Sequence, residues 1–365
     1  MYRLYVYISI LFLICLNDGV VSAENADEKN WRKGILRDEF IYDSTSFVSV
    51  HAPTIEETPS GLITAFFGGL YEGHPEVNIY VSRLVDAGWT EPVKVADGIV
   101  SDTLRKACYN PVLYQVPGKE LILFYKIGKN VQDWSGYLIR SYDDGITWSS
   151  PEALPEGFLG PIKNRPILID NTLVCGSSTE DQGWRVHMEF TEDFGVTWGK
   201  TAPLNDATWG IIQPSFLHHQ DGKLQFVCRS QNEAVVSAFS DDDGKTWSLP
   251  FALSVPNNNS GLDAVTLQDR RFLMVYNHVK AAESAFQDRK RTPLNVAISN
   301  DGIHWDASLI LEDSPIKEYS YPSVIQGADG MVHIVYTWRR EKVKYVKIDP
   351  SQLMAVPFTG EMWPF

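Results

Sequence analysis

Polar or titratable side chains stand at the start of six short apolar segments spread along the 365-residue chain. Several of them precede a proline, as in Asn110-Pro111, Gln213-Pro214 and Tyr321-Pro322. The six leading residues are His51, Asn110, Arg165, Gln213, Asp263 and Tyr321. A tyrosine beside a base can act as a nucleophile, a histidine can act as a base near neutral pH, and arginine binds carboxylates. If folding brings these residues together, they would form a polar site able to hold an anionic group.

A repeated octet accompanies these segments. Residues 141–148 read Ser-x-Asp-x-Gly-x-Thr-Trp, and the pattern returns at 191–198 and at 240–247. It is one residue shorter at 299–305, and only its ends and spacing remain at 82–89. In such an octet, called an Asp-box, the Asp bonds nearby amides, the Gly takes a positive φ and the Trp anchors the next strand. Copies about fifty residues apart indicate a repeated structural unit.

The segments between the octets read as strands, because apolar residues alternate and β-branched and aromatic residues are frequent. Six units of four strands predict an all-β fold, a six-bladed β-propeller with Asp-box turns over residues 46–365. The first strand of each blade lines the central channel, so the six leading residues should meet at one mouth. The ends of the second strands, including Arg229 and Trp338-Arg339, should open near the same mouth.

The N-terminal residues resemble a secretory signal followed by an entry segment. Residues 1–23 combine Arg3, an apolar run and the small residues Val21-Ser22-Ala23, which is typical of a cleavable signal peptide. The run is short for a membrane span, so we expect a secreted or periplasmic protein with no membrane span. Residues 24–45 are polar and charged, and we expect them to close onto the last blade.

The net charge and the motifs indicate which classes of partner and cofactor the chain is expected to lack. The net charge of −14 and the pI of about 5.0 disfavour a nucleic-acid partner. The sequence contains no HExxH, no CxxC pair and no phosphate-binding glycine loop, so we expect no metal and no cofactor. Beyond the leader, Cys108, Cys175 and Cys228 are an odd set, which we interpret as small buried side chains with room for one bridge. The sequence predicts no particular oligomeric state.

Five further stretches, with the Asp-boxes, carry a resemblance to a known family: residues 67–76, 161–166, 184–187, 259–263 and 336–340. The chain resembles the sialidase (neuraminidase) superfamily, particularly its sialidase-like BNR-repeat branch, over roughly residues 45–350. The resemblance implies a glycosidase with a Tyr nucleophile, an acid/base carboxyl group and three arginines that hold the substrate carboxylate.

Residue by residue, the resemblance implies that Tyr321 is the nucleophile and Arg229 the second arginine. Arg291 is the candidate for the third arginine. Glu76, or else Glu72, lies in the loop where the acid/base is expected. These residues form the predicted catalytic and substrate-binding set.

Two positions depart from the family pattern. His51 stands where the family has its first arginine, and Gln213 stands where it has the glutamate that pairs with the tyrosine. Gln213 cannot act as a base, so Glu189 and Glu318 are the open candidates for the base beside Tyr321.

The basic residues predicted near the mouth are Arg229, Arg165, Lys163, Arg185, Arg291 and Arg339. We interpret them as a clamp for a carboxylate or sulfate, since arginine has the matching fork geometry. The alternative is salt bridging to the acids Asp263, Glu189, Glu72 and Glu76. Gln213, Asp263 and Asn110 are expected to add polar contacts, and Trp338 to stack on a sugar or else pack in the core.

Three functions remain open, and all imply an anionic glycan or glycoconjugate as partner. The first is an exo-acting glycoside hydrolase for a terminal sialic or uronic acid, with Tyr321 and Glu76 as the catalytic residues. The second is a polysaccharide lyase on uronate glycans, with His51 as base and Tyr321 as acid. The third is a non-catalytic carbohydrate-binding propeller. His187, the other candidate base, reads rather as a structural histidine.

Overall fold

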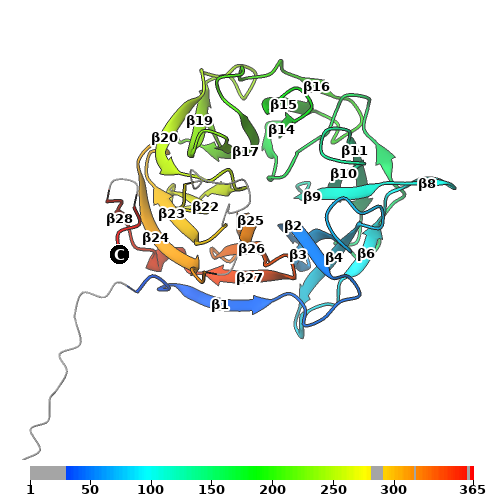
Figure 1. The fold of residues 1–365 in the computed structure, drawn as a ribbon, viewed down its shortest axis with the longest axis horizontal. Helices are drawn as coiled ribbons and strands as arrows, with labels where there is room; N and C mark the ends of the chain where they lie inside the picture. The colour runs from blue at the N-terminus through cyan, green and yellow to red at the C-terminus, as the bar shows by residue number, and fades with distance from the viewer. Residues whose placement is uncertain (1–29, 281–290, 316–317, 360–361) are drawn as a thin grey trace, which may run out of the picture. The chain divides into compact units, whose positions relative to one another are not determined.

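Six antiparallel sheets of four or five strands surround a central axis in the part of the chain from Trp31 to Phe365 (Figure 1). The computed structural model describes residues 30–280, 291–315, 318–359 and 362–365, and the predicted leader at 1–23 lies outside them. The arrangement confirms the six-bladed β-propeller that the repeats predict.

The strands of each blade run from the channel to the rim. The first blade contains β2 (Ser49–Thr58), β3 (Gly61–Gly69), β4 (Asn78–Val85), β5 (Gly88–Trp89) and β6 (Val93–Ala96). The second contains β9 (Ala107–Gln115), β10 (Leu121–Gly128), β11 (Ser135–Ser141) and β12 (Glu152–Ala153). The third contains β13 (Ile167–Ile169), β14 (Thr172–Thr179), β15 (Arg185–Thr191) and β16 (Gly199–Lys200).

The other three blades follow the same order. The fourth contains β17 (Ile211–His218), β18 (Leu224–Ser230), β19 (Ala234–Ser240) and β20 (Phe251–Pro256). The fifth contains β21 (Asp263–Thr266), β22 (Phe272–Tyr276), β23 (Leu294–Ser299), β24 (Trp305–Glu312) and β28 (Val356–Pro357). The sixth contains β25 (Tyr319–Gln326), β26 (Val332–Trp338), β27 (Lys342–Ile348) and β1 (Ile35–Phe40). A hairpin of β7 (Ile99–Ser101) and β8 (Leu104–Arg105) and a short helix η1 (Pro350–Gln352) lie outside the blades.

The ring is closed by the entry segment. Strand β1 pairs antiparallel with β27, and Asp38 lies opposite Val346. The outermost strand of the last blade therefore comes from the N-terminal side of the chain, while its other three strands come from residues 319–348. The pairing of residues 35–40 agrees with the expectation that the entry segment closes onto the last blade, while residues 24–29 of that segment lie outside the described residues.

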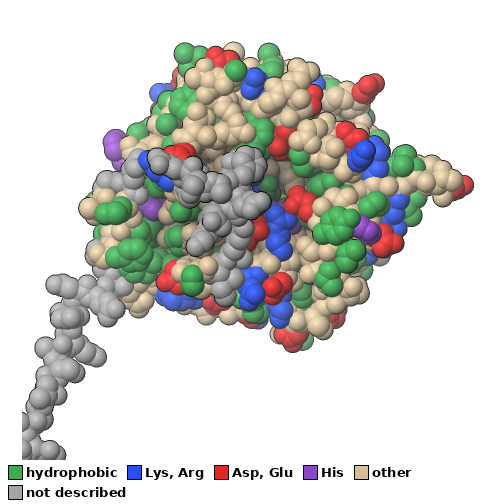
Figure 2. Space-filling view, in the orientation of Figure 1, with side chains coloured by type: hydrophobic (Ala, Val, Ile, Leu, Met, Phe, Trp, Pro, Cys, Tyr) green, Lys and Arg blue, Asp and Glu red, His purple; other side chains and the backbone are tan. Residues whose placement is uncertain are grey.

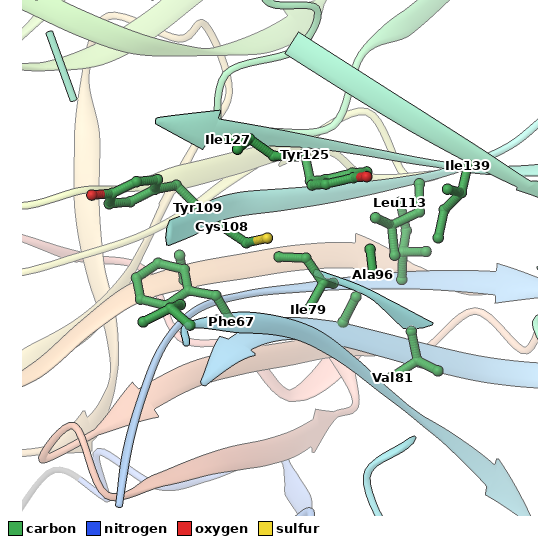
Figure 3. Packing of buried hydrophobic residues seen from close by; sticks show 14 of the residues in the cluster. Phe67, Ile79, Val81, Ala96, Cys108, Tyr109, Leu113, Tyr125, Ile127 and Ile139 are labelled. Atoms are coloured by element: carbon green, nitrogen blue, oxygen red, sulfur yellow. The ribbon is translucent and has the colours of Figure 1, made fainter. Parts of the chain in front are cut away.

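The core lies between neighbouring blades. Phe67 and Ile79 of the first blade pack with Cys108 and Tyr125 of the second, and all four are at most 2% exposed (Figure 3). Such contacts remove apolar surface from water and stabilise each blade against the next. Cys108, Cys175 and Cys228 are all buried and free, as expected of small apolar side chains and without the bridge that the sequence left open.

The Asp-box octets form compact turns between the third and fourth strands. In the second blade, Asp143 accepts hydrogen bonds from the backbone N–H and the hydroxyl of Thr147, at 2.8 and 2.6 Å. Gly145 has a φ of +83°, which L-residues avoid. Ser141 at the start of the turn pairs with Leu121, the residue that begins the second strand. These turns therefore lie at the end of the blade opposite to the end where the first strands begin.

Candidate functional site

Four first strands are bulged at their heads, and the bulges orient the residues that enter the channel mouth. Ala52, Asn110, Gln213 and Tyr321 each precede a proline and have φ values of +50°, +34°, +60° and +52°. The ladder register of each strand shifts at the same place. A left-handed non-glycine residue costs about 1–3 kcal/mol, and such strain and bulges gather at functional sites. The repeated bulge turns Tyr321 and Gln213 toward each other.

The phenol oxygen of Tyr321 is the centre of the cluster. Arg229 at the end of β18 donates to it through Nη1 at 2.9 Å, and Gln213 donates through Nε2 at 3.2 Å. Arg229 also donates to Oε1 of Gln213 at 3.3 Å and to Oδ1 of Asn259 at 2.8 Å. Negative charge that develops on the Tyr321 oxygen thus faces two fixed donors.

The ring of Tyr321 is surrounded by cations and one imidazole. The guanidinium carbons of Arg291 and Arg229 lie 5.5 and 5.7 Å from the ring centroid, and Nζ of Lys163 lies 5.8 Å from it. The His51 ring centroid is 4.1 Å away. Lys and Arg side chains, with Asp and Glu among them, are also exposed near the centre of the ring in Figure 2.

A carboxylate network holds two arginines at this mouth. Glu318 accepts from Arg291 at 2.8 Å and from Arg340 at 2.9 Å, and Glu72 pairs with Arg340 at 2.6 Å. Burial would raise the pKa of Glu318, but Arg291 and Arg340, with the hydroxyl of Ser320, hold it below its ordinary value. Glu318 is therefore a carboxylate that positions arginines, and no hydrogen bond joins it to Tyr321.

Burial and the surrounding cations together determine the protonation state of His51. This side chain is 1% exposed, and its Nδ1 lies 2.9 Å from Oγ1 of Thr337. Burial, followed by the charges of Arg340, Arg291, Arg229 and Lys163, lowers the pKa of His51 well below its ordinary value. The imidazole is neutral at physiological pH and contacts the Tyr321 ring.

A second carboxyl group faces Arg229 from the third blade. Glu180 follows β14 and hydrogen-bonds the side chain of Trp184, and Trp184 lies 5.0 Å from the guanidinium of Arg229. Burial raises the pKa of Glu180, although Arg229 acts in the opposite direction. A carboxyl group with a raised pKa at a mouth can donate a proton near neutral pH.

Beneath the cluster, two buried charges tie the channel walls together. Asp263 accepts from Ser215 at 2.6 Å and from the backbone N–H of Val324 at 2.9 Å. Lys163 donates to the carbonyls of Leu262 and Pro322, and burial lowers its pKa to about 8. Asp263 was predicted to contact the substrate, but the structure shows it buried below the mouth, where it connects two strands through hydrogen bonds.

Arg165 is a correction to the predicted clamp. Its guanidinium binds Glu56 at 2.6 Å and lies 5.0 Å from the ring of Tyr114. Arg165 and Glu56 line a cavity that also includes Gln115 and Gln326. Gln115 is the last residue of β9 and Gln326 the last residue of β25, and each of these is the first strand of its blade. Arg165 therefore faces the end of the channel opposite to Tyr321. The reason is that β13 begins only at Ile167, so the preceding segment runs down the channel and places Lys163 near the mouth instead.

Glu76 and Arg339 are also placed differently from the prediction. Glu76 is exposed and lines a separate cavity with Lys94 and Arg105, whereas Glu72 reaches the arginine network. The side chain of Arg339 pairs with Glu341 at 3.4 Å, whereas its neighbour Arg340 turns into the cluster. In both cases the site uses a residue one turn or one position away from the one predicted.

Three other predicted contacts have local structural partners. Arg185 donates to the carbonyl of Trp184, and Asn110 donates to the carbonyl of Ile162. Trp338 packs edge-on against Phe40 at 5.2 Å. None of these contacts involves Tyr321.

The remaining candidate bases are held within the third blade. Glu189 is fully buried and accepts from the backbone amides of Leu159 and Gly160. His187 lies 2.9 Å from it, which agrees with the structural reading of that histidine. The structure therefore does not bring Glu189 to Tyr321.

The sequence predicted that six residues meet at one mouth of the channel, and the structure confirms that they lie together around Tyr321. They are Tyr321, Arg229, Gln213, Arg291, Lys163 and His51. Sequence reasoning missed Arg340 and Glu180 as members of the site. Arg340 lay inside a stretch that carries the family resemblance, which was the available signal. Glu180 lies in a connection after β14 and gave no periodic signal.

Within the described ranges, no three His, Cys, Asp or Glu side chains are grouped so that they could hold a metal ion. The same part of the chain contains no helix that is long and apolar enough to cross a membrane.

Comparison with known proteins gives the class. The sialidase of Clostridium perfringens is 26% identical in an alignment 214 positions long that covers 46% of this chain and 56% of that protein, so the match spans about half of the relative. The Hadza microbial sialidase Hz136 superposes with a TM-score of 0.73 at 17% identity, over 87% of this chain and 69% of that one. The α-L-arabinanase of Penicillium chrysogenum complexed with arabinobiose superposes with a TM-score of 0.65 at 17% identity, over 88% of this chain and 99% of that one.

The fold is therefore a sialidase-like β-propeller whose structural neighbours include glycoside hydrolases. A family described as the BNR repeat-like domain matches residues 60–334. The chain belongs to this family.

Proposed function

We propose that the chain is an exported, exo-acting glycoside hydrolase that removes a terminal anionic sugar, of sialic or uronic acid type, from a glycan. The observation that carries the proposal is the environment of Arg229. Its guanidinium is buried beside Tyr321, and every hydrogen bond that the described residues accept from it goes to a neutral group. Among the described residues, Glu180 acts on this guanidinium through its charge and not through a hydrogen bond, so the donors of Arg229 can bind the acid group of a ligand.

The acid group of the sugar is held by Arg229, Arg291 and Arg340 in this proposal. Arg291 and Arg340 share Glu318, which fixes both guanidinium groups, and that of Arg291 lies 5.5 Å from the centroid of the Tyr321 ring. This set replaces the predicted contributions of Arg165 and Arg339. Arginine forks match a carboxylate better than lysine does, which supports an acidic sugar over a neutral one.

Tyr321 and Glu180 supply the two reacting groups. The Tyr321 hydroxyl gives its proton to solvent at the mouth, and its oxygen forms a bond to the anomeric carbon while the bond from that carbon to the leaving-group oxygen breaks. Glu180 gives its proton to the leaving oxygen, and its raised pKa keeps that proton available. Water then attacks the anomeric carbon, gives a proton to the Glu180 carboxylate and releases the Tyr321 oxygen, which takes a proton back from solvent. Glu180 takes the role that the sequence assigned to Glu76.

A lyase would need His51 to remove a proton from the substrate. At 1% exposure, and with Tyr321 against its ring, His51 lies beneath the residue that faces the mouth. This placement favours hydrolysis. Unlike a lyase, a hydrolase creates no double bond.

The test uses the full chain with 4-methylumbelliferyl glycosides of sialic acid and of glucuronic acid. Release of the fluorophore from one of them is the expected result, with at least a roughly 10³-fold loss in Tyr321→Phe. Tyr142→Phe, which alters a 77% exposed tyrosine in an Asp-box turn, is the matched control. Absorbance from an unsaturated uronate, or binding without any release, would overturn the proposal.

A further inference from the structure

In three of the four bulged first strands, a buried side chain donates a hydrogen bond to a backbone carbonyl of the bulge. The ladder register passes over the bulge residues, which are Asn110-Pro111 in β9, Gln213-Pro214 in β17 and Tyr321-Pro322 in β25. A buried carbonyl outside a regular ladder needs a donor from elsewhere, because leaving it unpaired destabilises the fold. These side chains therefore maintain the bulges.

Two of the three donors are neighbours in the segment that precedes β13. Asn164 donates through Nδ2 to the carbonyl of Gln213 at 3.0 Å, and Lys163 donates through Nζ to the carbonyl of Pro322. Lys163 also donates to the carbonyl of Leu262 at 3.0 Å and to Oδ1 of Asn164 at 2.7 Å. The Lys163–Asn164 pair thus joins the third blade to the fourth, fifth and sixth blades.

The local sequence explains why the third blade supplies this pair. Pro161 and Pro166 flank it, and a proline has no N–H to donate to a ladder. Strand β13 accordingly begins only at Ile167 and has three residues, whereas β17 and β25 have eight each. The segment before β13 is free to bond with its side chains the strands across the channel.

The Lys163–Asn164 pair holds the backbone next to two side chains that meet at the mouth. Gln213 and Tyr321 have φ values of +60° and +52°, and the Gln213 amide donates to the Tyr321 oxygen at 3.2 Å. Left-handed conformations of such residues persist only where the surrounding structure holds them. Without the bond from Lys163 to Pro322, the start of β25 can relax and move the Tyr321 oxygen away from Arg229.

Lys163 has no donor left for a ligand. Its ammonium group has three N–H bonds, and the carbonyls of Leu262 and Pro322 and the side chain of Asn164 accept one each. The side chains of Lys163 and Asn164 are also buried, at 4% and 2% exposure. The predicted contact of Lys163 with substrate is therefore replaced by contacts with the protein itself.

We propose that Lys163 and Asn164 are positioning residues, which hold Tyr321 and Gln213 in the geometry of reaction without touching the substrate. The inference rests on the proposed function for the reaction itself. Its geometric part, that the contact between Tyr321 and Arg229 requires Lys163, does not depend on turnover. The two ideas can therefore fail separately.

The test compares two buried lysines. Lys163→Met removes the donor to Pro322 and retains a long apolar side chain. Lys126→Met is the matched control, because Lys126 is also fully buried and donates to the carbonyls of Asn110 and Pro161. The bulge that Lys126 supports carries Asn110, whose side chain bonds the carbonyl of Ile162 and not Tyr321. Circular dichroism checks that both variants are folded.

Crystal structures of the variants test the geometry without any substrate. In Lys163→Met the Tyr321 oxygen should lie more than about 3.5 Å from Nη1 of Arg229, beyond hydrogen-bond distance. In Lys126→Met it should stay near the native 2.9 Å. A folded Lys163→Met protein that keeps this contact overturns the inference.

Asn164→Ala is the second variant, which decides the question where Lys163→Met does not fold. It removes the donor to the carbonyl of Gln213 without changing the charge of the chain. The Gln213 amide should then lie beyond hydrogen-bond distance of the Tyr321 oxygen in the crystal. A retained contact between Gln213 and Tyr321 overturns the inference.

The kinetic test uses the 4-methylumbelliferyl glycoside that the native chain hydrolyses. Lys163→Met should lower kcat about 10²-fold, because a misplacement of about 1 Å costs that much. It should change KM by less than about threefold, since the arginines that hold the acid group are unchanged. Lys126→Met should keep kcat within about twofold of the native value.

Equal losses of kcat in Lys163→Met and Lys126→Met overturn the inference, because the loss would then follow from removing any buried lysine. An unchanged kcat in Lys163→Met does the same. Absence of turnover by the native chain, with the Tyr321 oxygen displaced in the Lys163→Met crystal, supports the geometric part and overturns the proposed function alone.

Discussion

Arg229 donates to the phenol oxygen of Tyr321 at 2.9 Å, across 92 positions of sequence. The contact joins the end of β18 in the fourth blade to the head of β25 in the sixth. Gln213 supplies the second donor, so both acceptor positions of the phenol oxygen are used and its own proton remains for another partner. Two donors face the phenol oxygen, but position 213 offers no carboxylate to accept its proton.

The first prediction concerns this missing base. Gln213→Glu places a carboxylate where the amide now meets Tyr321 and Arg229. A carboxylate there can accept the phenol proton and retain the contact with Arg229. We expect kcat/KM for an anionic aryl glycoside to rise at least about tenfold, because a positioned general base contributes about 10²–10⁴-fold.

The control for that substitution is Gln220→Glu, which makes the same charge change at an exposed turn after β17. Its rate should equal that of the native chain. A Gln213→Glu protein that is folded but no faster would remove the requirement for a base beside Tyr321.

The second prediction separates two adjacent arginines. Arg340→Gln removes the cation that pairs with Glu72 and Glu318, whereas Arg339→Gln removes one that pairs with Glu341, its salt-bridge partner among the described residues. Arg340→Gln should raise KM for the anionic sugar about tenfold, as expected for loss of a charged hydrogen bond. Arg339→Gln should change KM by less than about twofold. Equal effects of the two substitutions on initial rates would exclude Arg340 from the clamp.

The sequence predicted the ring well because its signals are local and repeated. Each octet carries its own turn chemistry, such as the contact of Asp143 with Thr147, so the blades can be counted without knowing how they pack. Convergence of Tyr321 and Arg229 then follows from the geometry of any propeller, since first-strand heads and second-strand ends meet at one mouth.

The errors fall in segments without a repeat. The choice of Glu72 over Glu76 depends on a turn in which His74 donates to the carbonyl of Tyr71 and Gly73 has a φ of +91°. The use of Arg340 depends on a tight turn in which the backbone of both arginines is left-handed, with φ values of +57° and +62°. Side-chain directions in such turns change with every residue, so periodicity could not assign them.

The third prediction tests Glu180 as the proton donor. Burial raises the pKa of this carboxyl group, so activity should fall as pH rises through that pKa and the proton is lost. Glu180→Gln should remove this alkaline limb and lower the rate for a sugar leaving group about 10²-fold or more. A nitrophenolate leaving group needs little protonation, so its rate should change far less.

Glu192→Gln serves as the control for Glu180, because Glu192 is an exposed carboxyl in an Asp-box turn. Its pH profile should match that of the native chain. Equal losses for good and poor leaving groups in Glu180→Gln would mean that the residue only positions Trp184 or Arg229.

The fourth prediction concerns the buried Lys126. Its Nζ donates to the carbonyls of Asn110 and Pro161 between the second and third blades, and burial lowers its pKa from 10.5 to about 7, although Glu189 acts in the opposite direction. Between these values the unfolded chain binds more protons than the folded one, so Lys126 makes the free energy of unfolding rise with pH. Below about pH 7 both states are protonated, and the cost of burying the charge is fully present.

Lys126→Met lacks this contribution, so the stability of the native chain relative to the variant should increase from pH 6 to pH 9. The increase is at most about 2–3 kcal/mol, since one unit of pKa difference corresponds to about 1.36 kcal/mol. Urea unfolding at pH 6, 7, 8 and 9 measures the difference, and the similar contribution of Lys163 cancels because both proteins contain that residue. Lys245→Met, at an exposed lysine, should show the same dependence of the free energy of unfolding on pH as the native chain. If the free energy of unfolding of Lys126→Met also depends on pH as that of the native chain does, Lys126 stays charged in the folded protein and its burial does not govern the pH dependence of stability.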